Sequence, residues 1–510
     1  MIAVVDKLDM RQAEEKYTGT PGNPAYSRRM LLRTFIQASL DGIFSSRKID
    51  RLCHENVVYM YLTGHERPDF RTLCNFRKDS RDLLEHAFSF TITIARELGI
   101  AKFQHISTDG TKMKANASTR YNLTQDEISW IRKLIQHGIE TDEEEDRLYG
   151  DRSGDELPGD MDQEKIREKI EEYRLPSGKR PKKAAVAIAN SVVSAPEEQK
   201  EKLEEELDRA EEQLQQSEQQ AVSITDPEAR FMKNKKQRIE FCYNAQITVD
   251  HGSGIILAND VVQECTDHGQ LKPQIEQVES RVGPLPPGTT FSGDNGYYSG
   301  ENLRFLEEKG LDGYIPDSWQ AQEEKGKKGP GTFSKSNFSY DEDKDEFICP
   351  QGKELTRRGE YIRDDKDLYA YWGAPCERCP DQPECTGKWK RRVITSDGYE
   401  AERRRMRAKM DAPEGKKIYG RRKEWAEWPF GNLKHNLGFT EFYLRGNEKV
   451  KIEQNILSTA HNLKVIWRNL EGELERIEEI GGRKPDRSRG ESEKWFLAGF
   501  FDLFPAMIGC

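Results

Sequence analysis

A series of short strand-like segments, separated by helical ones, constrains the fold of this chain more than any other feature of its sequence. Residues 103–110 are predicted to form a strand that runs into a turn. Residues 238–250 and 254–263 flank His251–Gly254, a strong hairpin signal. The next expected elements are a helix at about 268–281, a strand at 289–292, a helix at about 299–309 and a strand at 313–316. With residues 121–230 set aside, the pattern predicts three consecutive strands in an antiparallel meander, followed by alternating helices and strands.

That order is the order of an RNase H-like core, so the predicted fold class is α/β with a mixed sheet. In such a core the first and fourth strands lie side by side, which would bring Asp109 and Asp294 to one edge of the sheet. Each aspartate is followed by a glycine within two residues, which lets the chain turn away from the carboxylate. A third acidic residue, Glu427, lies on a helix predicted at 417–434.

The rest of the chain is predicted to form helical and Cys-bearing units around this core. Residues 26–99 are expected to be helical, with a second helix at about 46–62 and Asp69 as the cap of a third. Because the later helices are basic, a helix-turn-helix-like DNA-binding unit and a plain helical bundle with a solvated basic face both fit.

Residues 121–222 are highly charged, with helix-forming runs near 125–148, 161–174 and 196–221. Three leucines of the last run form part of a weak heptad-like seam, and the Ala-rich run 184–189 is expected to interrupt the helical pattern. An inserted helical hairpin and a solvated coil without a function both fit this segment.

The predicted units are a helical N-terminal DNA-binding domain (1–100), the first part of the RNase H-like core (101–120 and 231–320), an acidic helical or coiled-coil insertion (121–230), a Cys-cluster insertion (321–398), the C-terminal helices of the core with Glu427 (399–475) and a C-terminal tail (476–510).

The charge of the chain is unevenly distributed. The formal net charge is −10, but acidic residues are in excess mainly in residues 121–229, whereas residues 1–120 carry more Lys and Arg than Asp and Glu. A nucleic-acid-binding surface requires a local basic patch rather than a basic total. Residues 400–434 suit such a surface, with 11 Lys and Arg against 6 Asp and Glu.

The sequence shows neither a signal peptide nor a membrane-spanning segment. Met1–Tyr17 carries too many charges for a signal peptide, and no window of the sequence is apolar enough for a membrane span. A cytoplasmic protein with reduced cysteines is therefore expected, and the resemblance described below implies association with the nucleoid.

Three carboxylates that converge at a sheet edge suit phosphoryl transfer. Mg²⁺ or Mn²⁺ binds carboxylate oxygens, and two such ions about 4 Å apart activate an attacking hydroxyl and stabilise the leaving oxygen. Asp109 would bridge the two ions, and Asp294 and Glu427 would each hold one. Because the chain has 90 acidic residues and Asp-Gly is common in turns, solvated charges and an ordinary turn are the alternative.

The stretch Tyr419–Lys434, YGRRKEWAEWPFGNLK, closely resembles the third signature of DDE transposases from bacterial insertion sequences. In that branch the Glu is followed by one residue, then Pro, Phe and Gly, and later by a Lys. Ser107–Lys112 resembles the first signature of the family, and Gly293–Tyr298 resembles the second. Tyr243–Gln246 resembles the strand before the hairpin.

The resemblance covers about residues 25–120 and 235–470. It implies metal-dependent cleavage at the inverted-repeat ends of a transposon and strand transfer into target DNA, with Asp109, Asp294 and Glu427 as the catalytic, metal-binding triad. Paired-end cutting implies a homodimer or a higher oligomer. A transposase-derived DNA-binding protein without catalysis and a related metal-dependent DNA nuclease are the alternatives.

The residues around Glu427 are implied to bind DNA. The family's Tyr, Arg and Lys correspond to Tyr419, Arg422 and Lys434, while Trp428 departs from the residue expected there. Lys434 follows Glu427 by two turns of a continuous helix and would share its face. Trp425 and Trp428 would either stack on an unpaired end base or pack in the core, and His268 would either approach the site or belong to a capping region.

A cluster of cysteines precedes this helix. Cys349 and the pair Cys376 and Cys379 form two knuckle-like turns, with Cys385 six residues further on. Four thiolates at this spacing predict one structural Zn²⁺, with buried thiols without a metal as the alternative.

Overall fold

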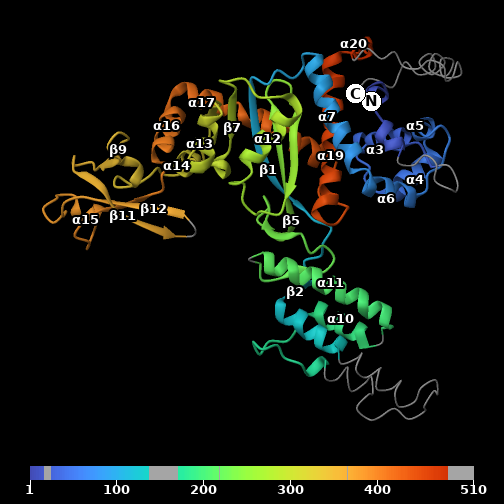
Figure 1. The fold of residues 1–510 in the computed structure, drawn as a ribbon, viewed down its shortest axis with the longest axis horizontal. Coiled ribbons are helices and arrows are strands. Elements are labelled where there is room, and N and C mark those ends of the chain that lie inside the picture. Colours follow the sequence, from blue (N-terminus) through green and yellow to red (C-terminus); the bar gives the residue numbers. More distant parts are fainter. Residues whose placement is uncertain (16–24, 137–169, 194, 218, 364–365, 481–510) are drawn as a thin grey trace.

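The computed structural model describes residues 1–15, 25–136, 170–193, 195–217, 219–363 and 366–480. Its central element is a six-stranded mixed sheet in which the order is β4-β5-β1-β7-β8 and β6 also pairs with β5 (Figure 1). The strands are β1 (His105–Lys114), β4 (Arg230–Lys233), β5 (Ile239–Asp250), β6 (Ile256–Val262), β7 (Thr290–Gly293) and β8 (Asp312–Tyr314).

The directions of these strands confirm the predicted mixed sheet. β1, β5 and β6 form the antiparallel meander, and β7 and β8 continue the sheet in parallel beyond β1. The first and fourth strands of the predicted series, β1 and β7, are therefore neighbours, with Thr108 opposite Gly293.

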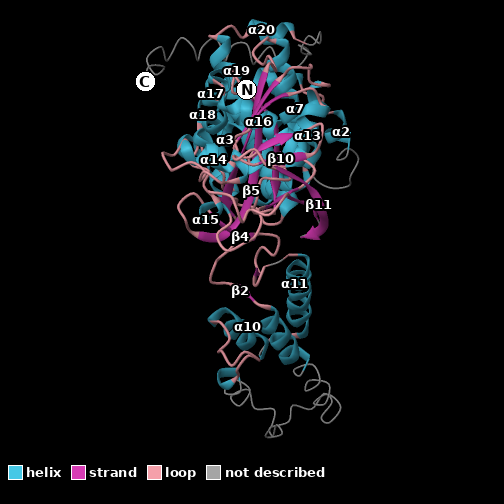
Figure 2. Ribbon diagram, turned by 90° about the vertical axis from the view of Figure 1, so that its left-hand side faces the viewer, coloured by secondary structure: helices cyan, strands magenta, loops and turns pink. Residues whose placement is uncertain are grey.

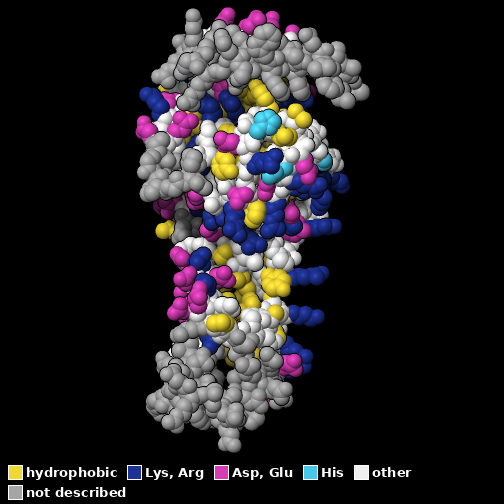
Figure 3. All heavy atoms as spheres, turned by 90° about the vertical axis from the view of Figure 1, so that its right-hand side faces the viewer, with side chains coloured by type: hydrophobic (Ala, Val, Ile, Leu, Met, Phe, Trp, Pro, Cys, Tyr) yellow, Lys and Arg dark blue, Asp and Glu magenta, His cyan; other side chains and the backbone are white. Residues whose placement is uncertain are grey.

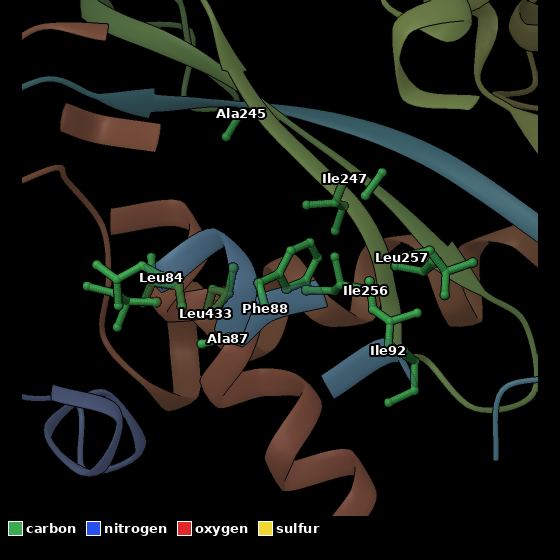
Figure 4. Packing of buried hydrophobic residues seen from close by; sticks show 14 of the residues in the cluster. Leu84, Ala87, Phe88, Ile92, Ala245, Ile247, Ile256, Leu257 and Leu433 are labelled. Carbon is green, nitrogen blue, oxygen red and sulfur yellow. The ribbon is translucent and has the colours of Figure 1, made fainter. Parts of the chain in front are cut away.

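Two long helices, α7 (Arg81–Glu97) and α19 (Asn447–Leu470), pack against the meander. Figure 4 shows Phe88 and Ile92 of α7 beside Ile247 and Ile256 of the sheet, and all four side chains are buried. The Asn462 side chain on α19 accepts a hydrogen bond from the Ile256 amide at 2.8 Å and donates one to its carbonyl at 2.9 Å. Because β6 pairs only with β5, the Ile256 amide and carbonyl need other partners, and Asn462 supplies them. The opposite side of the sheet carries α12 (Leu271–Val282), which packs against β5 and β6, and α13 (Gly300–Glu308), which packs against β8.

The N-terminal helices lie beside α7 and α19 (Figure 1). They are α1 (Ile2–Lys7), α2 (Arg11–Glu15), α3 (Arg28–Leu40), α4 (Ser46–Glu55), α5 (Val57–Leu62) and α6 (Phe70–Asp79). Asp69 caps α6 as predicted, since its carboxylate accepts from the Thr72 amide at 2.8 Å. The prediction of one helix over 46–62 was wrong, because Asn56 is extended and caps a new helix by accepting from the Val58 amide.

The charged insertion forms a separate helical unit that extends from one end of the central sheet (Figures 1 and 2). A two-stranded ribbon of β2 (Asn122–Leu123) and β3 (Val222–Ser223) joins it to the body, and α10 (Lys183–Val193) and α11 (Glu197–Gln216) pack in a small core of their own. The Ala-rich run does not interrupt the helical pattern as expected but forms α10, with Ala185 and Ala189 fully buried. Alanine is the best helix former, and its small side chain lets helices approach closely. The expected helix near 125–148 is present over 125–136, and the rest of it, like most of the run near 161–174, lies outside the described residues.

A second, five-stranded antiparallel sheet lies beyond β8 and carries the cysteines. Its strands are β9 (Ser339–Asp341), β10 (Glu346–Ile348), β11 (Glu354–Arg363), β12 (Lys366–Trp372) and β13 (Val393–Ser396), with α15 (Gln382–Cys385) before the last. Helices α14 (Ser318–Glu323) and α16 (Glu400–Asp411) connect it to the central sheet (Figure 1). Within the described part of the chain, no helix is long and apolar enough to cross a membrane.

Candidate active site

Asp109 and Asp294 lie next to each other because β1 and β7 are parallel neighbours. Asp109 lies within β1 and is 5% exposed, whereas the Asp294 side chain follows β7 and is 42% exposed. The predicted turn after Asp109 was wrong, because β1 continues through Gly110 to Lys114 and stays paired with β5. Asp294 caps the short 3₁₀ turn η1 (Asn295–Tyr297) by accepting from the Gly296 amide at 2.8 Å. The turn thus fixes one Asp294 oxygen and leaves the carboxylate at the mouth of the site.

Arg422 lies between the two aspartates. Its guanidinium donates to Asp109 Oδ1 at 2.9 Å and lies 4.0 Å from Asp294 Oδ2, and its side chain is 6% exposed. Burial raises the pKa of Asp109 to about 6, although Arg422 opposes this shift. Asp109 Oδ2 is buried without a hydrogen-bond partner. A buried carboxylate whose second oxygen has no partner is an environment that a divalent cation would stabilise.

The helix that carries Glu427 is not continuous, so the prediction of one helix over 417–434 was wrong. The segment consists of α17 (Pro413–Gly420), α18 (Arg422–Gly431) and a π-helical turn, η3 (Asn432–Asn436). Pro429 lies inside α18 and has no amide proton to donate to the preceding turn. The π-helical turn is wider than an α-helical turn and shifts the residues within and after it. The prediction that Lys434 shares a helix face with Glu427, which assumed a regular α-helix, therefore does not hold.

The family-signature residues nevertheless lie around the aspartates. Lys434 donates to Thr111 Oγ1 on β1 at 2.6 Å, and burial, assisted by repulsion from Lys235, lowers its pKa to about 8. Tyr419 is half-buried near Arg422, and burial raises its pKa to about 12. Glu427 is exposed on α18, and its charge has the smallest of the described effects on the pKa of Asp109.

A fourth carboxylate, Asp267, was not predicted as part of the site. Its Oδ1 accepts hydrogen bonds from Asn244 at 2.6 Å, Gln246 at 2.8 Å and Lys112 at 3.0 Å. The buried Tyr297 hydroxyl donates to Gln246, which links this cluster to the turn after Asp294. The only sequence signal was the alternation of Asn244 and Gln246 on one strand, which places two amides on one face of the sheet.

The glycine after Asp109 allows this cluster to approach β1. A Cβ atom on Gly110 would lie 2.4 Å from Gln246 Nε2 and 2.9 Å from Asp267 Oδ1. A side chain at this position would therefore displace the Asn244, Gln246 and Asp267 cluster from the strand that carries Asp109.

The tryptophans and His268 have different surroundings. Trp428 packs on Gly254, whose Cβ would lie 2.3 Å from the indole ring, and its ring centroid is 5.0 Å from that of His461. Trp425 is half-buried, with its ring centroid 6.4 Å from that of His251. His268 is exposed and, with Asn295, lines a cavity of about 510 Å³ beside the Asp294 turn.

Two stacked histidines lie under the start of α18. The ring centroids of His105 and His251 are 3.6 Å apart, His105 shares a 2.9 Å hydrogen bond with Ser292, and His251 is hydrogen-bonded to Ser107. Burial lowers the pKa of His105 to about 4 and that of His251 to about 3. Both rings are therefore neutral at pH 7.

The histidine pair should destabilise the fold in mild acid. Both pKa values lie below the unfolded value of about 6.5, so below pH 6.5 the unfolded chain binds protons that the folded chain does not. The free energy of unfolding is therefore highest above pH 6.5 and decreases as the pH falls toward 4. We expect a loss of about 1 kcal/mol per ring between pH 6.5 and 5, measured by urea unfolding. The raised pKa of Asp109 has the opposite effect on stability in acid, so the contribution of the histidines has to be isolated by a variant. In His251→Gln the free energy of unfolding should depend less on pH than in the unchanged chain. An equal dependence in both would contradict the assignment.

Neither predicted metal site has its ligands assembled around a common point. Among the residues that the structure describes, no group of three or more His, Cys, Asp or Glu side chains is placed to hold a metal ion. The four cysteines of the second sheet do line one small cavity, of about 30 Å³. All four are half-buried, and burial together with the other three thiols raises the pKa of Cys385.

Two protein families match the chain. Residues 348–467 match the family described as "Transposase DDE domain", and residues 1–79 match the one described as "Transposase domain (DUF772)". The chain is related to the DDE transposases of insertion sequences. The first match includes Arg422, Glu427 and Lys434, whereas Asp109 and Asp294 lie outside both matches. Among curated proteins, none matches the chain.

The family matches, which together cover less than half of the chain, support a general activity. A transposase DDE domain is that of an enzyme that acts on DNA, and enzymes of this family generally use divalent metals. The resemblance seen in the sequence of Tyr419–Lys434 is thereby confirmed.

Proposed function

We propose that the chain is an active DNA transposase that cleaves the inverted-repeat ends of a transposon and joins them to target DNA. The observation that supports this most directly is the pairing of Asp109 and Asp294 on neighbouring parallel strands, with Arg422 of the family signature between them. The strand order, with the meander β6-β5-β1 followed by β7 and β8, is consistent with an RNase H-like core.

Asp109, Asp294 and Glu427 would hold two Mg²⁺ or Mn²⁺ ions. Bound there, these ions would activate the attacking hydroxyl and neutralise charge on the leaving oxygen. The unpartnered Oδ2 of Asp109 and the half-exposed Asp294 supply the carboxylate oxygens that such ions require. Glu427 is on the exposed side of α18, where it would complete the site when DNA is bound.

The basic side chains around the carboxylates would bind the DNA backbone. The planar guanidinium of Arg422, which neutralises Asp109 in this structure, would be suited to pair with a DNA phosphate if cations neutralised Asp109 instead. Lys434, held on Thr111, and Tyr419 would contact neighbouring phosphates. Trp428 is half-buried against Gly254 and would support α18, and its exposed part would make the predicted contact with DNA.

The other units would serve the same reaction. The basic N-terminal helices would recognise the transposon ends, and paired-end cutting would require a homodimer or a higher oligomer. The four cysteines would bind a structural Zn²⁺ after a small movement of the loops that carry them. The protein would act in the cytoplasm at the nucleoid.

The function is tested on linear DNA that ends in the inverted repeats flanking the gene. We expect the purified chain to nick the repeat ends in Mg²⁺ but not in EDTA, and to join them to a target plasmid. A duplex with scrambled ends is the matched control and should remain uncut. Nicking without joined products would identify a nuclease, and binding without cleavage would identify a DNA-binding protein derived from a transposase.

A further inference from the structure

The turn between β4 and β5 is the most basic short segment near the active site. It contains Lys233, Lys235, Lys236 and Arg238 within six residues and has no acidic residue, in a chain whose net charge is −10. All four side chains are exposed. We call residues 233–238 the basic turn.

Hydrogen bonds of the Asn234 side chain and main chain close the basic turn. The Asn234 side chain accepts from the amides of Lys236 at 2.9 Å and Arg238 at 3.1 Å, and the Asn234 amide donates to the Arg238 carbonyl at 2.9 Å. Gln237 adopts the left-handed conformation, with φ of 62°, which closes the turn. The cations are therefore presented on a fixed loop, which lowers the entropy cost of binding a partner.

The cations of the basic turn have no acidic partner. Across the described residues, no ion pair includes any of the four, whereas the nearby Lys112 and Lys114 pair with Asp267 and Glu441. Adjacent like charges without a counter-ion repel each other, so an anionic partner would stabilise the turn.

The position of the basic turn relates it to the active site. The strand that follows the turn, β5, pairs through Cys242–Asp250 with β1, which carries Asp109. The charge of Lys235 affects the pKa of both Asp109 and Lys434, so its ammonium group lies near both residues. Figure 3 shows one face of the molecule, on which Lys and Arg side chains gather at mid-height.

We propose that the basic turn binds the phosphate backbone of the DNA that passes the active site. Lysine ammonium groups on a fixed loop neutralise phosphates without reading bases, so the contact would add affinity but no sequence preference. This proposal rests on the proposed function, because DNA at the Asp109 and Asp294 carboxylates is the anion that would lie beside Lys235.

The test measures binding of labelled duplex DNA in EDTA, where no cleavage occurs, over a series of salt concentrations. We expect Lys235→Gln combined with Lys236→Gln to reduce the slope of log affinity against log salt by about two, because each phosphate contact contributes about one. Affinity at low salt should fall about tenfold. The control is Lys388→Gln combined with Lys390→Gln, which makes the same change in charge at two exposed lysines of the loop between α15 and β13, where Lys390 lies 4.0 Å from Glu377.

Three outcomes separate this proposal from the proposed function. An unchanged slope, or the same reduction in the control, would overturn the proposal even if the chain cleaves transposon ends. A reduced slope confined to the turn variant would support it, also in a preparation that shows no cleavage. Loss of cleavage with an unchanged slope would place the lysines in the reaction and not in backbone binding, which again overturns it.

Discussion

Replacement of Arg422 by glutamine is expected to lower the free energy of unfolding by about 3–5 kcal/mol in EDTA at neutral pH. Arg422 is the only cation paired with Asp109 among the described residues, and both side chains are almost fully buried. Without the guanidinium, Asp109 would face Asp294 in a site where burial already raises its pKa to about 6. The loss is large because the remaining charge is buried and has no partner.

Divalent cations should reverse much of this loss. If Mg²⁺ or Mn²⁺ binds where the guanidinium now neutralises the aspartates, the midpoint of urea unfolding should rise more on addition of Mg²⁺ in Arg422→Gln than in the unchanged chain. Arg421→Gln is the matched control, because Arg421 is the preceding residue and is exposed, and it should change stability by no more than about 0.5 kcal/mol. Equal responses of both variants to Mg²⁺ would contradict a cation site at Asp109.

The order of strands in the central sheet could be predicted from the sequence because each step has a local signal. The His251–Gly254 turn sets the β5 and β6 hairpin, and helices between later strands require parallel crossovers. These signals place Asp109 beside Asp294 without any knowledge of packing. The prediction depended only on the order of the helices and strands along the chain, which can be predicted from a single sequence.

The details of the site could not be predicted because they depend on tertiary contacts. The break at Arg421 and the π-helical turn after Gly431 have no periodic signal, and the turn is held by a contact such as that of Asn432 with His461 at 3.1 Å. Asp267 lies on a loop, and its role is visible only when β5 brings Asn244 and Gln246 to it. The helix formed by the Ala-rich run could not be predicted because the small core in which it packs is assembled from several separate segments.

Replacement of Asp109 by asparagine is expected to reduce the rate of DNA cleavage in Mg²⁺ by at least about a thousandfold. The variant keeps the shape of the side chain but removes the charge that would bind both cations, and a loss of about 4 kcal/mol of transition-state stabilisation corresponds to that factor. DNA affinity in EDTA should change by less than about threefold, because the phosphate contacts come from other residues. The measurement is single-turnover cleavage of a labelled repeat end, with affinity determined separately in EDTA.

The same assay distinguishes which acidic residue completes the site. Glu427→Gln should lose as much activity as Asp109→Asn, while Glu424→Gln, three residues earlier on α18 and also exposed, should retain cleavage within about threefold. If Glu427→Gln retained activity and Asp267→Asn lost it, the third carboxylate would be Asp267, which already lies against β1 next to Asp109. Glu427 is exposed and has only a small effect on the pKa of Asp109, so its contribution should depend on DNA binding. Asp267 lies against Gly110, so an Asp267 variant should alter cation binding in the free protein as well.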